Sequence, residues 1–290
     1  MTEAPVIFDR ALVRRRQKRA LAQGPADFLL VAAVEELMAR LSAVQRAFRR
    51  AIDLGGPTPM LAQALAQSGR EVVRVGDDPA FAGDGEFVLA EDETLPVAPA
   101  SFDLVVSALA LQWVNDLPGL LAQIRRALKP DGLLLACLVG NASLSELRAS
   151  FMAAEAELEG GASPRVAPFG DVRELGRLMQ RAGFALPVVD FETLTVRYDS
   201  MFGLMADLRA MGATNALLAR SRKPLRRATL MRAAKIYAER YSDPDGRVRA
   251  SFDIVWLSGW APHESQQKPA ARGSATMSLA EALKAARKEK

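Results

Sequence analysis

Between residues 50 and 139, short apolar runs of strand length alternate with segments of helical periodicity. The first two apolar runs are followed directly by glycine, which allows the chain to turn sharply where a strand ends. Strands separated by helices in this way need right-handed crossovers and form a mostly parallel sheet. The expected strands cover residues 51–54, 72–75, 86–90, 102–108 and 132–138, and the expected helices cover residues 59–67 and 117–128.

The alternation continues with a helix over residues 171–182 and β-rich runs over 188–198 and 251–260. Together the runs predict a doubly wound, Rossmann-like α/β fold with a seven-stranded, mostly parallel sheet. Apolar residues at helical spacing predict a helical lid inserted at about residues 199–245. Three parts are therefore expected: a basic, solvated N-terminal arm over residues 1–26, one domain over 27–262 that includes the lid, and a C-terminal extension over 263–290.

The composition narrows the class of protein. Half of the 290 residues are hydrophobic, and 38 Lys and Arg against 34 Asp and Glu leave a net charge of only +4, too mild to predict nucleic-acid binding. No apolar run approaches the roughly 20 residues that span a bilayer, and no secretory signal is expected. The single cysteine, Cys137, is typical of a reducing compartment. We therefore expect the protein in the cytoplasm.

The scarcity of histidine and cysteine limits metal and acid–base chemistry. A two-histidine, one-carboxylate iron site cannot be built with one histidine, nor a cysteine-based zinc site with one cysteine, so no metal is predicted. His263 is a weak candidate for a general base, with a surface or capping role as the alternative. Trp113, just after the fourth expected strand, is a weak candidate on the substrate side, with packing as the alternative.

Small and acidic residues lie at the carboxyl ends of the first two expected strands. Asp53, Gly55 and Gly56 form a tight turn that allows backbone amides to approach a ligand. Asp77 and Asp78 follow the second strand, where a carboxylate can accept both hydroxyls of a ribose. The alternative for this acidic pair is a plain β-turn. The two turns thus predict a nucleotide-type cofactor at the carboxyl ends of the strands.

Later motifs are more specific. Acidic residues precede a Leu-Pro pair, then comes a Phe-Asp-Leu-Val strand, and the next helix ends in Lys-Pro-Asp-Gly. In this order the motifs resemble class I methyltransferases related to the ubiquinone- and biotin-pathway enzymes. The resemblance implies S-adenosylmethionine as cofactor. By position, the methionine part would meet Asp53, Gly55 and Gly56, the ribose Asp77 and Asp78, and the adenine Glu91 and Asp92, while Ala108 and Leu109 would line the pocket.

A second resemblance runs along nearly the whole chain. It rests on Ile7-Phe8-Asp9-Arg10, on Leu111-Gln112-Trp113-Val114-Asn115-Asp116, and on the tail motifs around Trp260, His263 and Arg272. These segments are similar to the complex I assembly factors of methyltransferase fold. That family implies hydroxylation of an arginine on the iron–sulfur subunit beside the quinone site, with S-adenosylmethionine as cofactor. The implied partner is a protein, with no nucleic acid and possible proximity to a membrane surface.

The cofactor turn departs from the family pattern. Pro57 and Pro59 stand where the pattern has glycines, and proline has no N–H to donate. Weakened or lost cofactor binding is therefore the alternative to an occupied site, and Pro59 can also be explained as the start of the next helix. Three functions therefore remain open: an arginine hydroxylase acting in complex I assembly, a small-molecule methyltransferase, and a non-catalytic assembly chaperone. We favour an enzyme.

Overall fold

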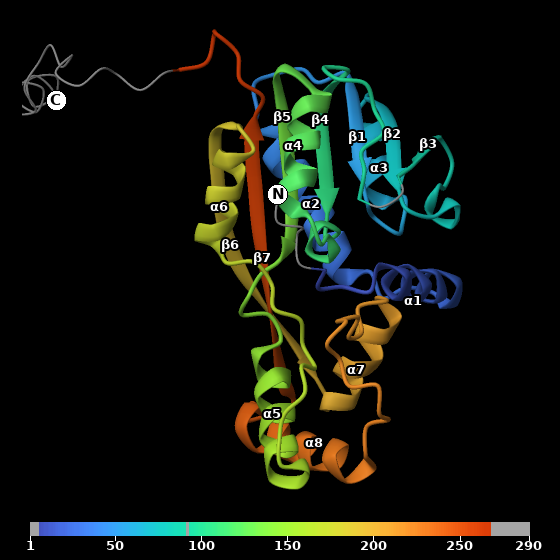
Figure 1. Cartoon of the computed structure of the whole chain (residues 1–290), viewed down its shortest axis with the longest axis vertical. Helices are drawn as coiled ribbons and strands as arrows, with labels where there is room; N and C mark the ends of the chain where they lie inside the picture. Colours follow the sequence, from blue (N-terminus) through green and yellow to red (C-terminus); the bar gives the residue numbers. More distant parts are fainter. Residues whose placement is uncertain (1–5, 91–92, 268–290) are drawn as a thin grey trace, which may run out of the picture.

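A computed structural model describes residues 6–90 and 93–267 of the chain. Its strands are β1 (Arg50–Leu54), β2 (Glu71–Gly76), β3 (Glu86–Leu89), β4 (Phe102–Ala108), β5 (Leu128–Val139), β6 (Ala185–Tyr198) and β7 (Val248–Trp260). Its α-helices are α1 (Arg10–Gln23), α2 (Phe28–Ser42), α3 (Met60–Gln67), α4 (Leu117–Ala127), α5 (Ser145–Glu159), α6 (Val172–Arg181), α7 (Met201–Ala210) and α8 (Arg227–Tyr241). Two short 3-10 helices are η1 (Pro79–Phe81) and η2 (Leu111–Trp113). Figure 1 shows their arrangement.

All seven strands form one sheet in the order β3-β2-β1-β4-β5-β7-β6. The strands from β1 to β5 pair in parallel, whereas β7 is antiparallel to both β5 and β6. The predicted seven-stranded, mostly parallel sheet is confirmed. The order changes direction between β1 and β4, and open α/β sheets bind ligands at the carboxyl ends of the strands beside such a point.

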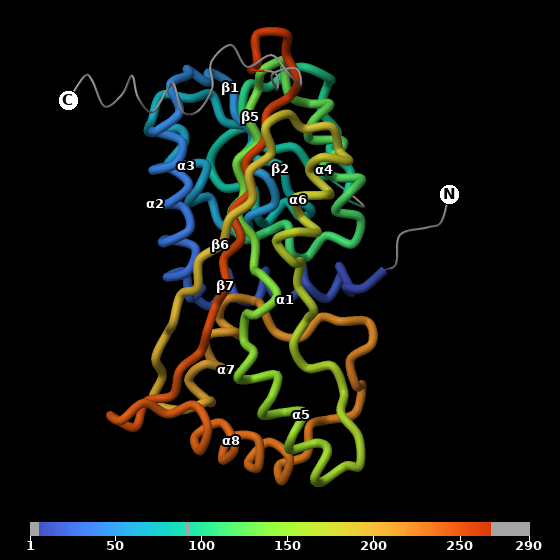
Figure 2. Tube along the Cα trace, turned by 90° about the vertical axis from the view of Figure 1, so that its left-hand side faces the viewer, coloured from blue at the N-terminus to red at the C-terminus, as the bar shows by residue number. Residues whose placement is uncertain are grey.

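Helices cover both faces of the sheet. Figure 2 shows α2 and α3 on one side and α4 and α6 on the other. Alternate residues of the central strands supply the two cores: Ala51 packs with the α2 and α3 side, and its neighbour Ile52 packs with the α4 and α6 side. This two-residue period is what a strand buried on both faces requires.

A helical lobe of α5, α7 and α8 lies beyond one end of the sheet, joined to it by the long β6–β7 pair (Figure 1). The lid expected over residues 199–245 contains α7 and α8, but the predicted elements do not include α5. Its buried face carries two acids, Glu146 and Glu155, whose carboxylates accept hydrogen bonds from Ser251 and Arg165. Because acids occupy core positions, the apolar periodicity that predicts a helix is weak here.

The basic helix α1 is not the solvated arm that its charge suggested. Leu12 and Val13 are buried, and the ring of Phe8 meets that of Trp113 edge-on with centroids 5.4 Å apart. Asp9 caps the helix by accepting from the Leu12 N–H. Both views place α1 between the sheet and α7 (Figures 1 and 2), and the arrows of Figure 1 show that it lies at the carboxyl ends of the parallel strands.

Within residues 6–90 and 93–267, no helix is long and apolar enough to cross a membrane. The same residues hold no group of three or more His, Cys, Asp and Glu side chains that could share a metal ion.

Candidate functional site

A cavity opens where the order of the strands reverses, under α1. We call it the switch-point cavity. Gly55 lines it after β1 and Asp77 after β2. Its apolar wall includes Val75, Ala90, Leu111, Val114 and Leu120. An apolar wall next to the carboxylates of Asp77 and Glu93 suits a nucleoside, whose base is largely apolar on its faces and whose sugar donates hydroxyl hydrogens.

Asp77 is held by the N-terminal helix. Arg10 Nη2 donates to Asp77 Oδ2 at 2.8 Å, and Arg14 Nη1 donates to the Asp77 carbonyl at 2.9 Å. The Asp77 side chain keeps 23% of its surface exposed, and that of Arg10 keeps 30%. The carboxylate therefore faces the cavity, with one of its oxygens paired to a cation that remains close to solvent.

Asp78 has a different environment from its neighbour. Its carboxylate accepts from the Ala80 N–H at 2.9 Å and from Lys18 at 3.1 Å. Burial acts to raise the pKa of Asp78, but these hydrogen bonds outweigh it and leave the pKa below its usual value. Asp78 begins η1 and lies outside the lining of the switch-point cavity.

Asp53 lies beneath the turn and away from the cavity. Its side chain is 1% exposed, and Oδ2 accepts from Arg74 Nε at 2.9 Å while Oδ1 has no hydrogen-bond partner. Burial raises the pKa of Asp53 to about 6 even though Arg74 acts to lower it. The sequence assigned Asp53 to the cofactor. In the structure its carboxylate instead pairs with the buried Arg74.

Arg74 also holds the turn that contains the prolines. Its Nη2 donates to the carbonyls of Gly56 and Thr58, both at 2.7 Å, and its Nη1 donates to the carbonyl of Phe81. Pro59 directly precedes α3, as the helix-start interpretation expected, whereas Pro57 lies within the turn. The turn is therefore fixed through its carbonyl groups by a buried guanidinium.

Gly55 is the glycine that the turn requires. Its φ of +83° is unfavourable for other residues, and a Cβ there would lie 3.1 Å from the Cβ of Ala110. Gly56 has no such constraint and does not line the switch-point cavity. Glu91 and Asp92 lie outside the described residues, but Ala90 and Glu93 on either side of them both line it.

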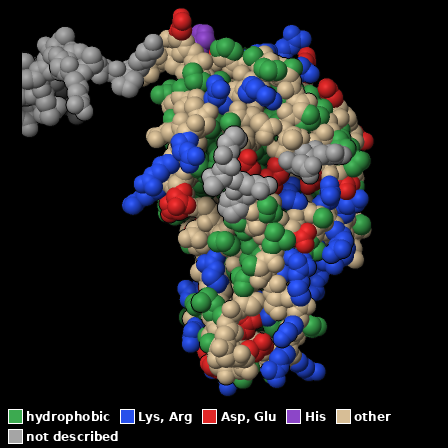
Figure 3. Space-filling view, viewed as in Figure 1, with side chains coloured by type: hydrophobic (Ala, Val, Ile, Leu, Met, Phe, Trp, Pro, Cys, Tyr) green, Lys and Arg blue, Asp and Glu red, His purple; other side chains and the backbone are tan. Residues whose placement is uncertain are grey.

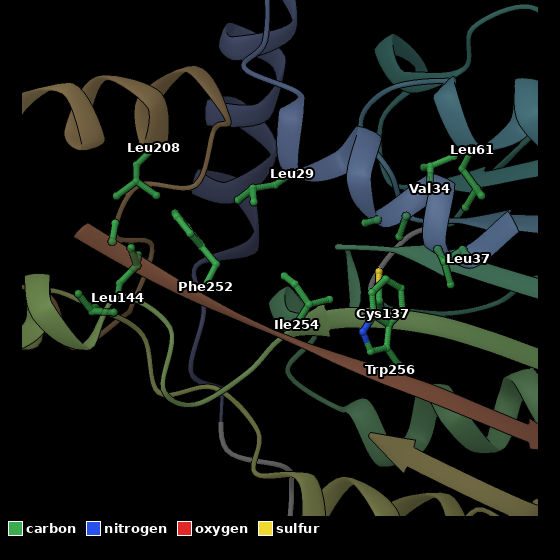
Figure 4. Packing of buried hydrophobic residues seen from close by; sticks show 14 of the residues in the cluster. Leu29, Val34, Leu37, Leu61, Cys137, Leu144, Leu208, Phe252, Ile254 and Trp256 are labelled. Carbon is green, nitrogen blue, oxygen red and sulfur yellow. The ribbon is translucent and has the colours of Figure 1, made fainter. Parts of the chain in front are cut away.

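A second, largely apolar cavity adjoins the first. We call it the inner cavity. Ala108 and Leu109 line it at the end of β4, so they lie in a cavity next to the one that holds Asp77. Leu109 has a left-handed φ of 50°, an unfavourable conformation that aims its carbonyl at Gln112 Nε2, 2.6 Å away. Figure 4 shows Leu29, Leu208 and Phe252, from three separate elements, pointing into one region of this part of the core.

The two weak catalytic candidates lie at opposite ends of the sheet. Trp113 is 7% exposed and lines both cavities, so it stands at their junction. His263 is exposed and bonds within its own tail to Ser265, and Gln266 of the same tail donates to Asp131 near the start of β5. The one histidine, purple in Figure 3, lies at the end of the molecule away from the helical lobe.

Sequence reasoning did not single out the residues of α1 that line the switch-point cavity. Arg10, Arg14 and Gln17 are spaced as i, i+4 and i+7, which places them on one helix face. That spacing, together with the acids at the end of β2, could have indicated that this face of α1 packs against the carboxyl end of β2. Basic and acidic side chains intermingle on the face of the molecule shown in Figure 3.

Comparison with known proteins agrees with this geometry. A family described as "Methyltransferase domain" matches residues 25–187, which is more than half of the chain. The human protein named "Arginine-hydroxylase NDUFAF5, mitochondrial" is 42% identical over 288 residues, covering 95% of this chain and 83% of its own. This chain belongs to the methyltransferase domain family. It is an enzyme of methyltransferase-fold type, with arginine-hydroxylases among its relatives.

Other members of the methyltransferase domain family are more distant. A malonyl-[acyl-carrier protein] O-methyltransferase of Methylovorus is 33% identical over 281 residues, covering 90% of this chain and 92% of its own. The crystal structure of the Bacillus YcgJ protein superposes with a TM-score of 0.54 at 14% identity, covering 79% of this chain and 99% of that one. At that identity the superposition shows the shared fold alone.

Proposed function

We propose that this chain is an S-adenosylmethionine-dependent enzyme that modifies an arginine of a protein by hydroxylation. The observation that carries the proposal is the pair of cavities joined at Gln17 and Trp113. One cavity suits a nucleoside and the other suits a side chain, so two reactants can meet at their junction. The choice of arginine follows the name of the 42% identical human relative.

The residues present fit the cofactor. Asp77 would accept the hydroxyls of its ribose, the apolar wall would contact its adenine, and Gly55 would allow its close approach to the backbone. When bound, S-adenosylmethionine would supply an electrophilic sulfonium centre, whereas hydroxylation also requires an oxygen atom and a two-electron oxidant, which dioxygen with a reductant would provide as co-substrates, with water as the second product. The loss of N–H donors at Pro57 and Pro59 is compatible with this site, because Arg74 already fixes the turn through carbonyls.

Trp113 supports the proposal as a positioning residue. Its ring is buried at the junction of the cavities, and its carbonyl accepts from Arg10 Nη1 at 3.1 Å. A rigid aromatic wall there orients two ligands and keeps water from the space between them.

The proposed partner is the iron–sulfur subunit beside the quinone site of complex I, modified during assembly. The likeness of this chain to the complex I assembly factors supports that partner, and no nucleic acid is proposed. The proposed location is the cytoplasm, with the acceptor subunit close to a membrane surface. The human arginine-hydroxylase relative carries "mitochondrial" in its name, which describes that protein.

The deciding experiment is calorimetric titration of S-adenosylmethionine into the protein and into two matched variants. Asp77→Asn should weaken binding about tenfold or more, because the amide replaces one of the two acceptor oxygens with an N–H donor and removes the negative charge. Asp78→Asn should have little effect, because Asp78 lies outside the cavity. No binding by the unaltered protein at millimolar cofactor would contradict the enzyme proposal and favour the assembly chaperone.

A deletion strain tests the acceptor. Mass spectrometry of the iron–sulfur subunit should find its arginine unmodified in that strain and modified in the parent. An arginine that stays modified in the deletion strain would contradict the proposal. The small-molecule alternative has a relative in the malonyl-[acyl-carrier protein] O-methyltransferase. Methyl transfer from the cofactor to malonyl-acyl carrier protein would favour that alternative.

A further inference from the structure

The inner cavity has apolar walls but contains unsatisfied polar atoms. Its walls include Leu109, Leu144, Phe169, Leu208 and Phe252. Burying a polar atom without a partner costs about 1–3 kcal/mol, so such atoms in a cavity point to a ligand that satisfies them. Two of the unpartnered buried polar atoms in the described chain belong to residues that line this cavity.

The first of these atoms is Gln112 Oε1. The amide nitrogen of Gln112 donates to the Leu109 carbonyl at 2.6 Å, which assigns the remaining oxygen as an acceptor. That oxygen is buried and has no partner. The left-handed backbone of Leu109 supports the arrangement, because it presents the carbonyl that orients the amide. The strained turn after β4 therefore holds one acceptor ready.

The second atom is Thr58 Oγ1, which is likewise buried without a partner. Thr58 lies between the two prolines, and its carbonyl is held at 2.7 Å by Arg74. The prolines on either side restrict the backbone of Thr58, and the buried guanidinium of Arg74 holds its carbonyl. Its hydroxyl can accept a hydrogen bond from a ligand in the inner cavity.

The third acceptor is the carboxylate of Asp27. This residue directly precedes α2, where an aspartate usually caps the helix, yet its side chain makes no capping hydrogen bond. It is exposed and lines the inner cavity. Among the described residues that line this cavity, Asp27 is the only charged one. The cavity therefore carries a negative charge at its margin with no cation inside.

We propose that the inner cavity binds the arginine side chain, with its aliphatic stem against the apolar walls and its guanidinium donating to Asp27, Thr58 and Gln112. The inference rests on the proposed function, which takes arginine as the target. A guanidinium has five N–H donors and no acceptor, so three groups able to accept suit it. The junction at Trp113 would place that side chain next to the switch-point cavity.

A neighbouring cavity toward the helical lobe gives a contrast in charge. It shares Trp113 with the inner cavity but is lined by Arg16, Arg165 and Arg209. A guanidinium placed there would be repelled by these cations. In the inner cavity, as far as the structure describes its lining, the one charged residue is the acid Asp27, and the unpaired atoms of Thr58 and Gln112 can accept hydrogen bonds. The charge distribution therefore favours the inner cavity for a cationic side chain.

The test measures binding of N-acetyl-arginine methylamide to the full-length protein by calorimetry. N-acetyl-citrulline methylamide serves as the neutral probe, because it keeps the stem and replaces one donor group with a carbonyl. We expect the arginine probe to bind about tenfold more tightly than the citrulline probe. Equal affinities for the two probes, or no binding of the arginine probe at millimolar concentration, would overturn the proposal.

Variants identify the acceptors. Asp27→Asn and Gln112→Leu should each weaken the arginine probe several-fold and leave the citrulline probe less affected. Asp171→Asn is the matched control, since Asp171 caps α6 by accepting from the Arg173 N–H and lines neither cavity. Asparagine keeps the capping hydrogen bond at position 171, and at position 27 there is no such bond to lose. An arginine affinity that is unchanged in both cavity variants would overturn the assignment.

Titration with S-adenosylmethionine separates this inference from the proposed function. Binding of the arginine probe with its expected preference, in a protein that does not bind the cofactor, would leave the cavity assignment intact and remove the enzyme proposal. Binding of the cofactor without preference for the arginine probe would remove the cavity assignment and leave the enzyme proposal intact.

Discussion

The ends of β1 and β2 look alike in sequence and differ in structure. Each has an aspartate within two residues of a glycine at its carboxyl end, yet Asp53 is 1% exposed and Asp77 is 23% exposed at the side chain. The parallel register sets Asp53 directly beside Arg74, whose guanidinium turns inward to pair with it. Asp77 lies one residue beyond the end of β2 and meets Arg10 of α1 instead. The same pattern thus produces a structural acid and a candidate binding acid.

Arg74 and Arg10, the arginines that pair with these two aspartates, also differ in burial. Arg74 is 4% exposed and donates to one carboxylate and four backbone carbonyls. Arg10 is 30% exposed at the side chain, pairs with the carboxylates of Asp77 and Glu93 and donates to one carbonyl. Breaking a buried pair leaves a charge without compensation, whereas an exposed pair contributes little. The pair at β1 should therefore govern stability, and the pair at β2 should govern ligand binding.

The largest effect is expected from Arg74→Met. The substitution leaves Asp53 buried without its cation and removes the donors that hold the Gly56 and Thr58 carbonyls, so the free energy of unfolding should fall by about 3–5 kcal/mol. Urea denaturation measures the loss. The double variant Asp53→Leu with Arg74→Met is the control and should recover part of it, because no charge stays buried. A loss below about 1 kcal/mol in the single variant would contradict the structural role.

The next effect concerns pH and the buried acid. Burial raises the pKa of Asp53 from 3.8 to about 6, so the folded protein holds this proton more tightly than the unfolded chain. That contribution to stability is complete below pH 3.8 and is lost as pH rises through about 6, a change of about 3 kcal/mol.

Asp53→Asn has no such proton to lose. We therefore expect the unfolding free energy of the unaltered protein to decline relative to that of Asp53→Asn as the pH rises from 4 to 7. Urea denaturation of both proteins across this interval measures the difference. A difference that stays constant with pH would show that Asp53 remains ionised throughout.

A smaller effect is expected from Arg10→Ala. In the free protein Arg10 occupies Oδ2 of Asp77, so a ribose must compete for that oxygen. Removing a partly exposed pair should strengthen S-adenosylmethionine binding by roughly threefold to tenfold. Lys18→Ala is the matched control, because Lys18 pairs with Asp78 outside the cavity. Weaker binding by Arg10→Ala would mean that the arginine helps to hold the cofactor.

The smallest effect is expected at the only histidine. His263→Ala removes a side chain that bonds within its own tail at the edge of the sheet opposite the cavities. Cofactor affinity and arginine modification should both stay unchanged, measured by the same titration and mass spectrometry. A clear loss of modification with intact cofactor binding would restore His263 as a candidate for the active site.

Local patterns were enough to predict much of this protein. The two-residue and helical periodicities predicted the seven-stranded sheet, because burial on two faces forces them into the sequence. The glycine at position 55 predicted a sharp turn, which its φ of +83° confirms. The α5 helix escaped prediction because Glu146 and Glu155 occupy its buried face, where acids are stable only with partners distant in sequence.

The sequence by itself determined the succession of strands, the glycine turn, and the presence of an acid near the carboxyl end of both β1 and β2. Only the tertiary structure decided which acid is accessible, because the β1–β2 register brings Arg74 beside Asp53 and the packing of α1 brings Arg10 to Asp77. The inner cavity is likewise a tertiary feature, formed by residues from Gln17 to Phe252. Periodicity reports burial along one element, whereas register and packing depend on residues that meet only in the folded chain.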